Sequence, residues 1–371
     1  MSRILLVEPY HGGSHAAWAE GFTAHSRHEV ITVSHPGSYW RWRMRGSSLT
    51  LAAEAEVVVE RHGKPDVVIV SGMTDLAAWL GFTRRFLGDT PVVLYLHENQ
   101  LMYPLAPGQQ ADASLPLVNW LGMAAADEVW FNSTFQRDGL LKALPALLER
   151  APDEVHTPWL DDVVSACQVV PVGVDLSDIP VRNAGAPCPE VLTVLWNQRW
   201  DHDKNPGAVM KALLKLAAED IAFRVAIAGE NTRVDPREMT EAREQLGDRV
   251  IQFGHLPRPE YVDLLGVSDV VVSAAHHEFF GIAVVEAVAA GAVPVLPTRQ
   301  SYPELVPDGW HGAALYPEGG LTRRLREVLS DLPTWRNRVV GLDVAMRRFD
   351  WRQVVEDYDD RIDALSAGPC N

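Results

Sequence analysis

The sequence predicts an α/β protein made of two Rossmann-like domains that face a central cleft. Its 371 residues are enough for two domains of ordinary size. Short β-branched runs alternate with helical stretches along both halves, a pattern typical of parallel sheets covered by helices on both faces. Around residues 173–190 this alternation gives way to a stretch rich in proline, glycine and aspartate, which indicates a linker between the domains.

In the first half, the expected strands are short apolar runs, and a helix is expected over residues 16–25. The strands cover residues 4–7, 30–33, 67–70, 92–96 and 127–131. Runs of the same kind in the second half predict strands over residues 191–195, 225–228, 250–253, 270–274 and 293–296. We therefore expect an N-terminal domain over residues 1–173 and a C-terminal domain over residues 174–350. The tail is expected to be helical, with a last helix over about 351–371 that packs back on the first domain.

Composition argues against a membrane-embedded or disulfide-stapled protein. The chain is 47% hydrophobic and 22% charged, as in ordinary globular proteins, and it has no run of about 18 apolar residues. Its first residues resemble a strand and not a signal peptide. Cys167, Cys188 and Cys370 are too widely spaced for a disulfide framework or a cysteine zinc site. A cytoplasmic protein with no membrane partner is expected.

The charge balance is acidic in both halves. Lys and Arg number 33 against 49 Asp and Glu, a net charge of −16, and each of the segments 1–175 and 176–371 carries −8. This is the opposite of the usual footprint of a nucleic-acid-binding domain. A polyanionic partner would therefore need a local basic patch.

The stretch HHEFFGIAVVEAVAAGAVPV, residues 276–295, places two carboxylates eight residues apart. Glu278 follows a predicted strand at its carboxyl end, where ligands of open α/β sheets bind. Glu286 lies inside a helix expected to begin near Phe280, and Gly281 would let a phosphate approach the free N–H groups of that helix. Alternatively, Glu278 only caps a helix and Glu286 is a solvated or internally paired charge.

These residues resemble the Glu-x7-Glu signature of retaining glycosyltransferases with the GT-B fold. The resemblance implies that Glu278 contacts and orients the donor sugar and that Glu286 contacts the ribose of the nucleotide. Departure of a nucleoside diphosphate builds negative charge on phosphate, so the site needs fixed cations, which are expected in WNQRWDHDKNP, residues 196–206. The donor-binding candidates in the second half are Arg199, Lys204, Phe280, Gly281 and Glu286. Gly12 and Gly13, in the loop after the first strand, are further donor-binding candidates, because a bare backbone lets a ligand approach; a simple tight turn is the alternative. The alternative for the two cations is an ordinary place on a surface loop.

Asp201 and Asp203 form a DxD sequence, the pattern that binds a divalent metal in the other glycosyltransferase fold. Here Arg199 and Lys204 already supply positive charge, so neither a catalytic metal nor any other cofactor is expected. The dinucleotide fingerprint GxGxxG is also missing after the first strand, which weakens a dehydrogenase interpretation.

A narrower resemblance covers nearly the whole chain. Seven blocks recur in the same order in tRNA-queuosine α-mannosyltransferases: EPYHGGSH, YWRWRMR, LHENQLMYP, VWFNSTFQ, WNQRWDHDKNP, HEFFGIAVVEA and YPEL. The resemblance implies transfer of mannose from GDP-mannose, with retained configuration, to queuosine in a tRNA anticodon loop. The first domain would then bind the acceptor and the second the nucleotide sugar.

Two N-terminal blocks add candidates on the acceptor side. His97, Glu98 and Asn99 follow the 92–96 strand, and family resemblance makes His97 the best candidate beside the transferring hydroxyl; a purely structural histidine is the alternative. Residues 39–45 interleave aromatic and basic side chains that can stack on bases and meet phosphates. The RNA-binding candidates there are Trp40, Arg41, Trp42, Arg43 and Arg45. A half-buried edge segment is the alternative.

Two other functions stay open at this point. A related glycosyltransferase could act on a glycan, a lipid or a small metabolite, which the acidic charge would suit. A non-catalytic sugar-nucleotide-binding or tRNA-binding protein is the other alternative. The sequence identifies no dedicated general base.

Overall fold

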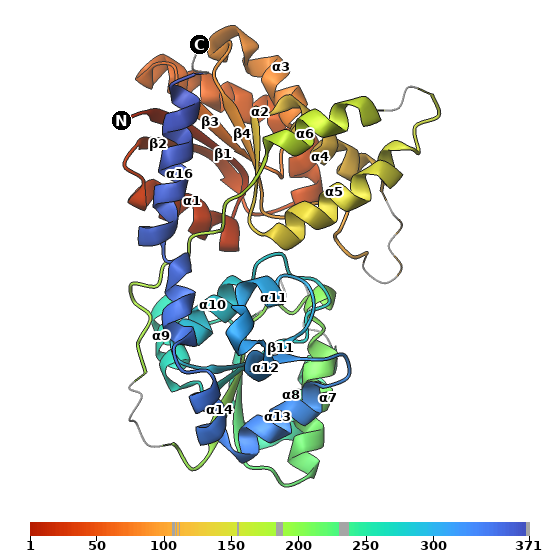
Figure 1. Ribbon diagram of the computed structural model, residues 1–371, viewed down its shortest axis with the longest axis vertical. Coiled ribbons are helices and arrows are strands. Elements are labelled where there is room, and N and C mark those ends of the chain that lie inside the picture. The colour runs from red at the N-terminus through yellow and green to blue at the C-terminus, as the bar shows by residue number, and fades with distance from the viewer. Residues whose placement is uncertain are drawn as a thin grey trace. The chain divides into compact units, whose positions relative to one another are not determined.

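A computed structural model describes residues 1–105, 108, 110, 112–153, 156–182, 188–229 and 237–368 (Figure 1). The chain divides into two units, one formed by Met1–Val174 with Trp351–Asn371 and the other by Asp175–Asp350. Each unit contains a six-stranded sheet whose paired strands are all parallel. The predicted α/β class is thus confirmed. Cys370 and residues 183–187 of the expected linker lie outside the described residues.

The sheet of unit 1 has the strand order β2-β1-β3-β4-β5-β6. Its strands are β1 (Arg3–His11), β2 (Glu29–Pro36), β3 (Val67–Ser71), β4 (Val92–Leu96), β5 (Glu128–Phe131) and β6 (Cys167–Val169). In the register of β1, Ile4 lies opposite both Val30 of β2 and Val67 of β3. The strand order reverses direction at β1 and β3, which is where doubly wound sheets open a ligand site at their carboxyl edge.

Helices on unit 1 bury the two faces of this sheet. They are α1 (Gly13–His25), α2 (Trp40–His62), α3 (Leu76–Leu87), α4 (Ser114–Ala125), α5 (Thr134–Leu148), η1 (Thr157–Trp159), α6 (Leu160–Ala166) and α16 (Trp351–Ser366). Side-chain caps start α3 and α5, because Asp75 accepts from the Ala78 N–H and Ser133 from the Gln136 N–H. The sequence pattern did not predict α2.

Helix α16, drawn in blue, lies beside α1 in unit 1 (Figure 1). Its Trp351 ring fills the space over two glycines: a Cβ at Gly21 would lie 2.0 Å from Trp351 Nε1, and one at Gly173 would lie 2.2 Å from Trp351 Cδ2. The Tyr358 hydroxyl accepts from Trp18 Nε1 at 3.1 Å and donates to the Pro171 carbonyl at 3.0 Å. The last helix is therefore an integral part of the first core.

Unit 2 has the strand order β12-β11-β10-β7-β8-β9. Its strands are β7 (Leu192–Trp196), β8 (Phe223–Ala228), β9 (Val250–Gly254), β10 (Val270–Val272), β11 (Val293–Pro297) and β12 (Leu315–Tyr316). This is the Rossmann order, and its switch point lies between β7 and β10. The expected strand over 270–274 ends at Val272, because the next two carbonyls accept from side chains: that of Ser273 from the Tyr316 hydroxyl at 2.8 Å and that of Ala274 from Arg299 at 2.9 Å.

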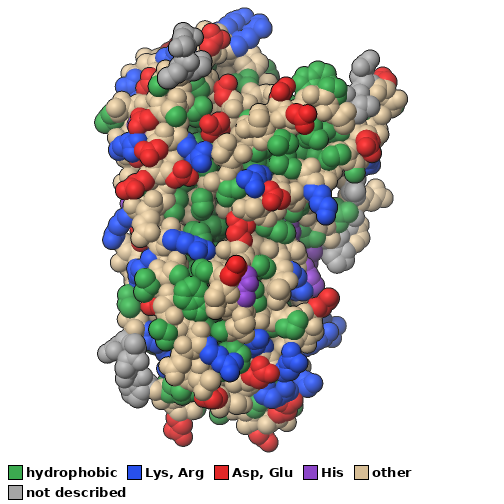
Figure 2. All heavy atoms as spheres, viewed as in Figure 1, with side chains coloured by type: hydrophobic (Ala, Val, Ile, Leu, Met, Phe, Trp, Pro, Cys, Tyr) green, Lys and Arg blue, Asp and Glu red, His purple; other side chains and the backbone are tan. Residues whose placement is uncertain are grey.

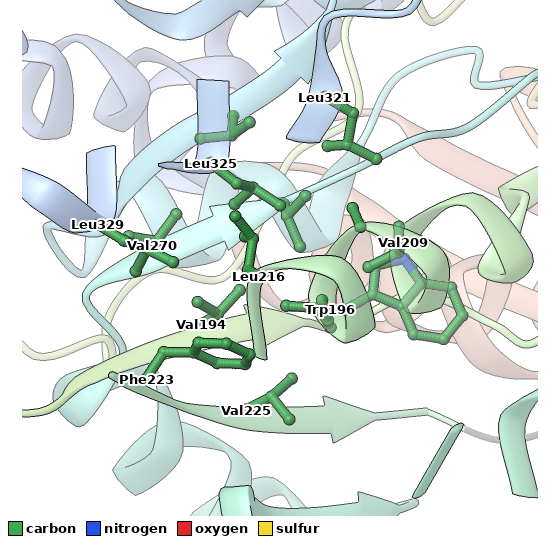
Figure 3. Packing of buried hydrophobic residues seen from close by; sticks show 14 of the residues in the cluster. Val194, Trp196, Val209, Leu216, Phe223, Val225, Val270, Leu321, Leu325 and Leu329 are labelled. Carbon is green, nitrogen blue, oxygen red and sulfur yellow. The ribbon is translucent and has the colours of Figure 1, made fainter. Parts of the chain in front are cut away.

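Helices and short 3-10 turns complete unit 2. They are η2 (His202–Lys204), α7 (Pro206–Ala218), α8 (Arg237–Leu246), η3 (Gly247–Arg249), α9 (Arg258–Val267), α10 (Ile282–Ala289), α11 (Tyr302–Leu305), η4 (Asp308–Trp310), α12 (His311–Ala314), α13 (Leu321–Ser330), α14 (Leu332–Arg338), α15 (Leu342–Met346) and η5 (Arg347–Phe349). Figure 3 shows side chains from β7, β8 and β10 meeting those of α7 and α13 in the core, with Val194 and Leu325 both fully buried. This apolar layer holds the strand ends that carry the polar residues of the site.

Two surface features bear on partners. On the face in Figure 2, Lys and Arg side chains are interspersed with Asp and Glu, and no broad basic field gathers there. Within the described ranges, no helix combines the length and the apolar character needed to cross a bilayer.

Candidate active site

The carboxyl ends of β7 and β10 bring two predicted donor residues into contact. Lys204 ends the connection after β7, and Glu278 lies in the loop after β10. Lys204 Nζ is 3.1 Å from Glu278 Oε2 and donates to the His277 carbonyl at 2.9 Å. Lys204 is buried, so its ammonium is held in one place. One cation and one carboxylate therefore meet at the switch point of unit 2.

Local contacts explain why the connection after β7 stays in this position. Asn205 takes a left-handed backbone conformation (φ 52°) just before Pro206 begins α7. The Asn205 side chain donates to the Ala274 carbonyl at 3.3 Å, and the Asp203 carbonyl accepts from the His276 N–H at 2.7 Å. The connection and the loop after β10 are thus tied together along their length.

Gly281 makes the turn from this loop into α10. Its φ of 110° disfavours any residue with a Cβ, and a Cβ there would lie 3.7 Å from Glu278 Cγ. Helix α10 begins at Ile282, so its first N–H groups have no acceptor within the helix and favour an anion. The Phe280 ring packs edge-on against Phe349, with ring centroids 5.1 Å apart. If Phe280 contacts the nucleotide sugar, it would therefore do so through its backbone.

Glu286 is buried on α10 and bound to side chains of α9. One carboxylate oxygen pairs with Arg258, and the other accepts from the Tyr261 hydroxyl at 3.0 Å. Burial raises the pKa of Glu286, and the Arg258 guanidinium opposes that rise. Asn197 joins the network by donating to the Tyr261 hydroxyl at 2.8 Å. To bind a ribose, Glu286 would exchange one of these partners.

The DxD sequence is split between two ion pairs. Arg199, with a side chain 64% exposed, places Nη1 2.8 Å from Asp201 Oδ2. Asp203 is buried, and its Oδ2 lies 3.3 Å from Lys204 Nζ. The two carboxylates therefore balance different cations of the same connection.

A second cluster of charge lies at the carboxyl edge of unit 1. Across the described part of the chain, one group of three or more possible metal ligands has its ligand atoms within 4.8 Å of one another: Glu8, His15 and His97. His15 Nδ1 is 3.1 Å from Glu8 Oε2, and His15 Nε2 is 3.4 Å from Glu98 Oε2. Because both ring nitrogens of His15 already face carboxylates, the cluster is a chain of ion pairs in which His15 is a cation.

The glycine pair before α1 shapes this edge. Gly13 has a φ of 53°, which a residue without a Cβ adopts freely. Gly12 packs back-to-back with Gly37: a Cβ on Gly12 would lie 3.0 Å from the Gly37 Cα. This turn reverses the chain after β1 and brings His15 over Glu8.

The residues after β4 take different positions. His97 lies beside His15, with ring centroids 4.3 Å apart. Asn99 is fully buried and accepts from the Met102 N–H at 2.9 Å, so its carboxamide closes a turn. Glu98 bonds to His15. A role of Glu98 or Asn99 toward an acceptor stays a prediction.

The predicted RNA-binding cluster forms the first turns of α2. Trp40 is partly buried against Met44 and its neighbours, whereas Trp42 is 67% exposed. Arg41 lies over the Trp40 ring, 5.1 Å from its centroid, and Arg45 pairs with Asp112. Arg43 is half-buried. The cluster is therefore divided: one tryptophan belongs to the core side and the other faces outward.

Sequence reasoning missed several residues of the two clusters. Glu8 and His15 lie within the EPYHGGSH block and could have been singled out there. Arg258 and Tyr261 had no such signal, because they stand 28 and 25 residues before Glu286 and only the packing of α9 on α10 brings them together.

Comparison with known proteins decides the family. The family described as tRNA-queuosine alpha-mannosyltransferase N-terminal matches residues 3–174. A tRNA-queuosine alpha-mannosyltransferase of Drosophila melanogaster is 34% identical over 315 residues, which are 82% of this chain and 81% of that protein. The chain belongs to the tRNA-queuosine α-mannosyltransferase family.

The predicted family is thus confirmed, and so is the prediction of an enzyme, because the family described as Glycosyl transferases group 1 matches residues 189–339. A GDP-mannose:cellobiosyl-diphosphopolyprenol alpha-mannosyltransferase of Xanthomonas oryzae is 25% identical over 92% of this chain and 84% of its own. This member of the tRNA-queuosine α-mannosyltransferase family therefore also shares sequence with a second α-mannosyltransferase.

Solved structures agree on the fold. HepE of Anabaena in complex with UDP-glucose superposes with a TM-score of 0.70 at 15% identity, covering 98% of this chain and all of that one. The sucrose-phosphate synthase of Thermosynechococcus elongatus gives a TM-score of 0.70 at 18% identity, with coverage of 99% and 100%. The tRNA-queuosine α-mannosyltransferase family member described here therefore has the GT-B fold.

Proposed function

We propose that this enzyme transfers mannose from GDP-mannose, with retained configuration, to queuosine in the anticodon loop of a tRNA. The contact between Lys204 and Glu278 at the switch point of unit 2 carries the proposal on the donor side. The proposed identities of the acceptor and of the transferred sugar rest on membership in the tRNA-queuosine α-mannosyltransferase family. The enzyme is proposed to act in the cytoplasm on a soluble tRNA, without a membrane partner, a metal or another cofactor.

In the proposed reaction the bond between the anomeric carbon and the diphosphate breaks as the acceptor oxygen bonds to the same face of that carbon. The acceptor proton passes to the departing phosphate oxygen. Lys204 and Arg199 stabilise the charge that develops on the diphosphate, together with the free N–H groups at the start of α10. Glu278 orients the sugar, and Glu286 binds the ribose.

The acceptor side is assigned to unit 1. His97 would bond to a hydroxyl at the reaction centre, with Gly12 and Gly13 beside the donor. Trp42 and the arginines of the first turns of α2 would receive the anticodon loop, because exposed aromatic faces stack on unpaired bases and guanidinium groups pair with phosphates.

The test is incubation of the protein with queuosine-containing tRNA and a panel of nucleotide sugars, followed by mass analysis of the nucleosides. A hexose added to queuosine from GDP-mannose alone is expected. Transfer from another nucleotide sugar would overturn the assignment of GDP-mannose as the donor. Transfer to a glycan or lipid in place of tRNA would overturn the assignment of tRNA as the acceptor.

A pair of lysine variants tests the donor site. Lys204→Ala should lower the rate of transfer about 10²–10³-fold, the usual effect of removing one fixed group that stabilises developing charge. Lys211→Ala removes an exposed lysine of α7 and should leave the rate unchanged. Equal rates for the wild type and Lys204→Ala would rule out the assigned role.

A further inference from the structure

A buried cation lies between two carboxylates at the carboxyl edge of unit 1. Glu8, three residues before the end of β1, is fully buried, and His15 of α1 is 5% exposed. The two oxygens of Glu8 are both used, since Oε1 accepts from the Tyr10 N–H at 2.8 Å and Oε2 faces His15 Nδ1 at 3.1 Å. Glu98 faces the other ring nitrogen of His15 at 3.4 Å. Two carboxylates therefore hold one imidazole at both ends.

This arrangement determines the charge of His15. Burial alone lowers its pKa, but the charges and hydrogen bonds of Glu8 and Glu98 outweigh burial and raise the pKa of His15 to about 10. His15 is then an imidazolium throughout the physiological range.

The ring of His97 is enclosed by aromatic side chains and by this cation. Its centroid is 4.3 Å from that of His15, 4.5 Å from Trp18 and 4.6 Å from Tyr95. The His97 carbonyl accepts from the Asn132 side chain at 2.8 Å. His97 Nε2 is buried and has no hydrogen-bond partner within the described segments of the chain. Packing on several sides thus fixes the ring while leaving one nitrogen without a bond.

The titratable groups that face His97 come from several elements. Within the described residues they are Glu8 from β1, His15 from α1, Tyr95 from β4 and, behind Tyr95, Tyr358 from α16. Glu98, from the same loop as His97, faces His15. Burial raises the pKa of the Tyr95 and Tyr358 phenols, so both are uncharged. Apart from burial, the charge that lowers the pKa of His97 is therefore that of His15.

We propose that His15 is a positioning residue that, held between Glu8 and Glu98, fixes the ring of His97 and keeps it uncharged, so that Nε2 can bond to a hydroxyl of the bound substrates. The link to substrate rests on the proposed function. Burial, together with the positive charge on His15, lowers the pKa of His97 well below its ordinary value. Without that cation, one of the two causes that lower the pKa of His97 would be gone, and the pKa of His97 should rise.

The direct test is a pH titration of the histidine rings of the full-length protein by NMR, with the His97 signal assigned from a His97→Gln variant. In the wild type, the His97 signal should not titrate between pH 5.5 and pH 8. In His15→Gln, which cannot carry a charge, it should titrate within that range. In His15→Lys, which restores a cation, it should again stay constant.

Each alternative result has a defined meaning. A midpoint near pH 6.5 for His97 in the wild type would overturn the proposal without any variant, so a failure of His15→Gln to fold would not protect it. An unchanged His97 signal in folded His15→Gln would also overturn it. Because this experiment requires no substrate, its outcome is separate from that of the proposed transferase activity.

Kinetics supply the second readout. The kcat of the wild type for sugar transfer should not fall on the acidic side between pH 8 and pH 6, whereas that of His15→Gln should fall about tenfold for each unit below the new midpoint. The KM for the nucleotide sugar should change little, because unit 2 is not altered. A uniform loss of kcat at every pH would indicate a structural role alone and would overturn the proposed control of protonation.

Discussion

At the scale of single residues, the ion pair between Arg258 and Glu286 links α9 to α10. Arg258→Ala should lower the free energy of unfolding by about 1–3 kcal/mol, because it leaves a buried carboxylate without its cation. The 40% exposure of the Arg258 side chain keeps this below the cost of a fully buried pair. Chemical denaturation measures it.

The matched control for Arg258→Ala is Arg237→Ala. Arg237 also pairs with a glutamate, Glu241, but its side chain is 90% exposed. This change should cost less than about 0.5 kcal/mol. A loss for Arg237→Ala as large as for Arg258→Ala would show that burial of Glu286 is not the cause.

The charge on His15 predicts a dependence of stability on pH. A folded-state pKa of about 10 lies above the ordinary value of 6.5, so the stabilisation is fully present below about pH 6.5 and is lost as the pH rises toward 10. The difference in unfolding free energy between the wild type and His15→Gln should therefore be smaller at pH 10 than at pH 6.5.

Urea denaturation at the two pH values measures this difference. His62→Gln, at an exposed position near the end of α2, is the control and should differ from the wild type equally at both. A constant difference for His15→Gln would mean that His15 is not charged in the folded state.

At the scale of elements, the first turns of α2 present the aromatic and basic cluster. Trp42→Ala should weaken binding of queuosine-containing tRNA by about 1–3 kcal/mol, the usual contribution of one base stacked on an aromatic ring. The free energy of unfolding of the protein should change little in this variant, since Trp42 is 67% exposed. A filter-binding or fluorescence titration provides the measurement.

Trp159→Ala is the control for the effect of losing an exposed tryptophan. Trp159 lies in η1 of the same unit and is 56% exposed, but it has no neighbouring run of arginines. Its removal should leave tRNA binding unchanged. If both variants bind tRNA as the wild type does, the RNA-binding surface lies elsewhere.

The strands expected from apolar runs were found where burial of the strand produces such a run. The expected strand over 92–96 coincides with β4, all of whose residues are buried. In contrast, α2 was missed, and the strand expected over 270–274 is shorter in the structure. The carbonyls of Ser273 and Ala274 accept from the side chains of Tyr316 and Arg299, which are distant in the sequence. Such contacts leave no local periodicity.

At the scale of the whole molecule, the net charge of −16 limits how RNA can be held. If binding depends on the three arginines of the first turns of α2, the logarithm of the binding constant should fall with the logarithm of salt concentration with a slope of about −2. The triple change of Arg41, Arg43 and Arg45 to Ala should flatten this slope and leave GDP binding intact. A slope of about −6 or steeper would indicate an extended basic surface instead.

The sequence by itself determined the α/β class through its β-branched runs. It also determined the GT-B fold and the family, through the resemblance carried by the spacing of Glu278 and Glu286 and by seven motif blocks in one order. All of these are local features of the chain. Only the tertiary structure decided which charges meet. Glu286 pairs with Arg258, and His15 lies between Glu8 and Glu98, since strand order and helix packing bring together residues that are far apart in the chain. The free energy of a charged side chain depends on its burial and on its distance to the nearest opposite charge. Neither the burial nor this distance can be derived from the spacing of residues in the sequence.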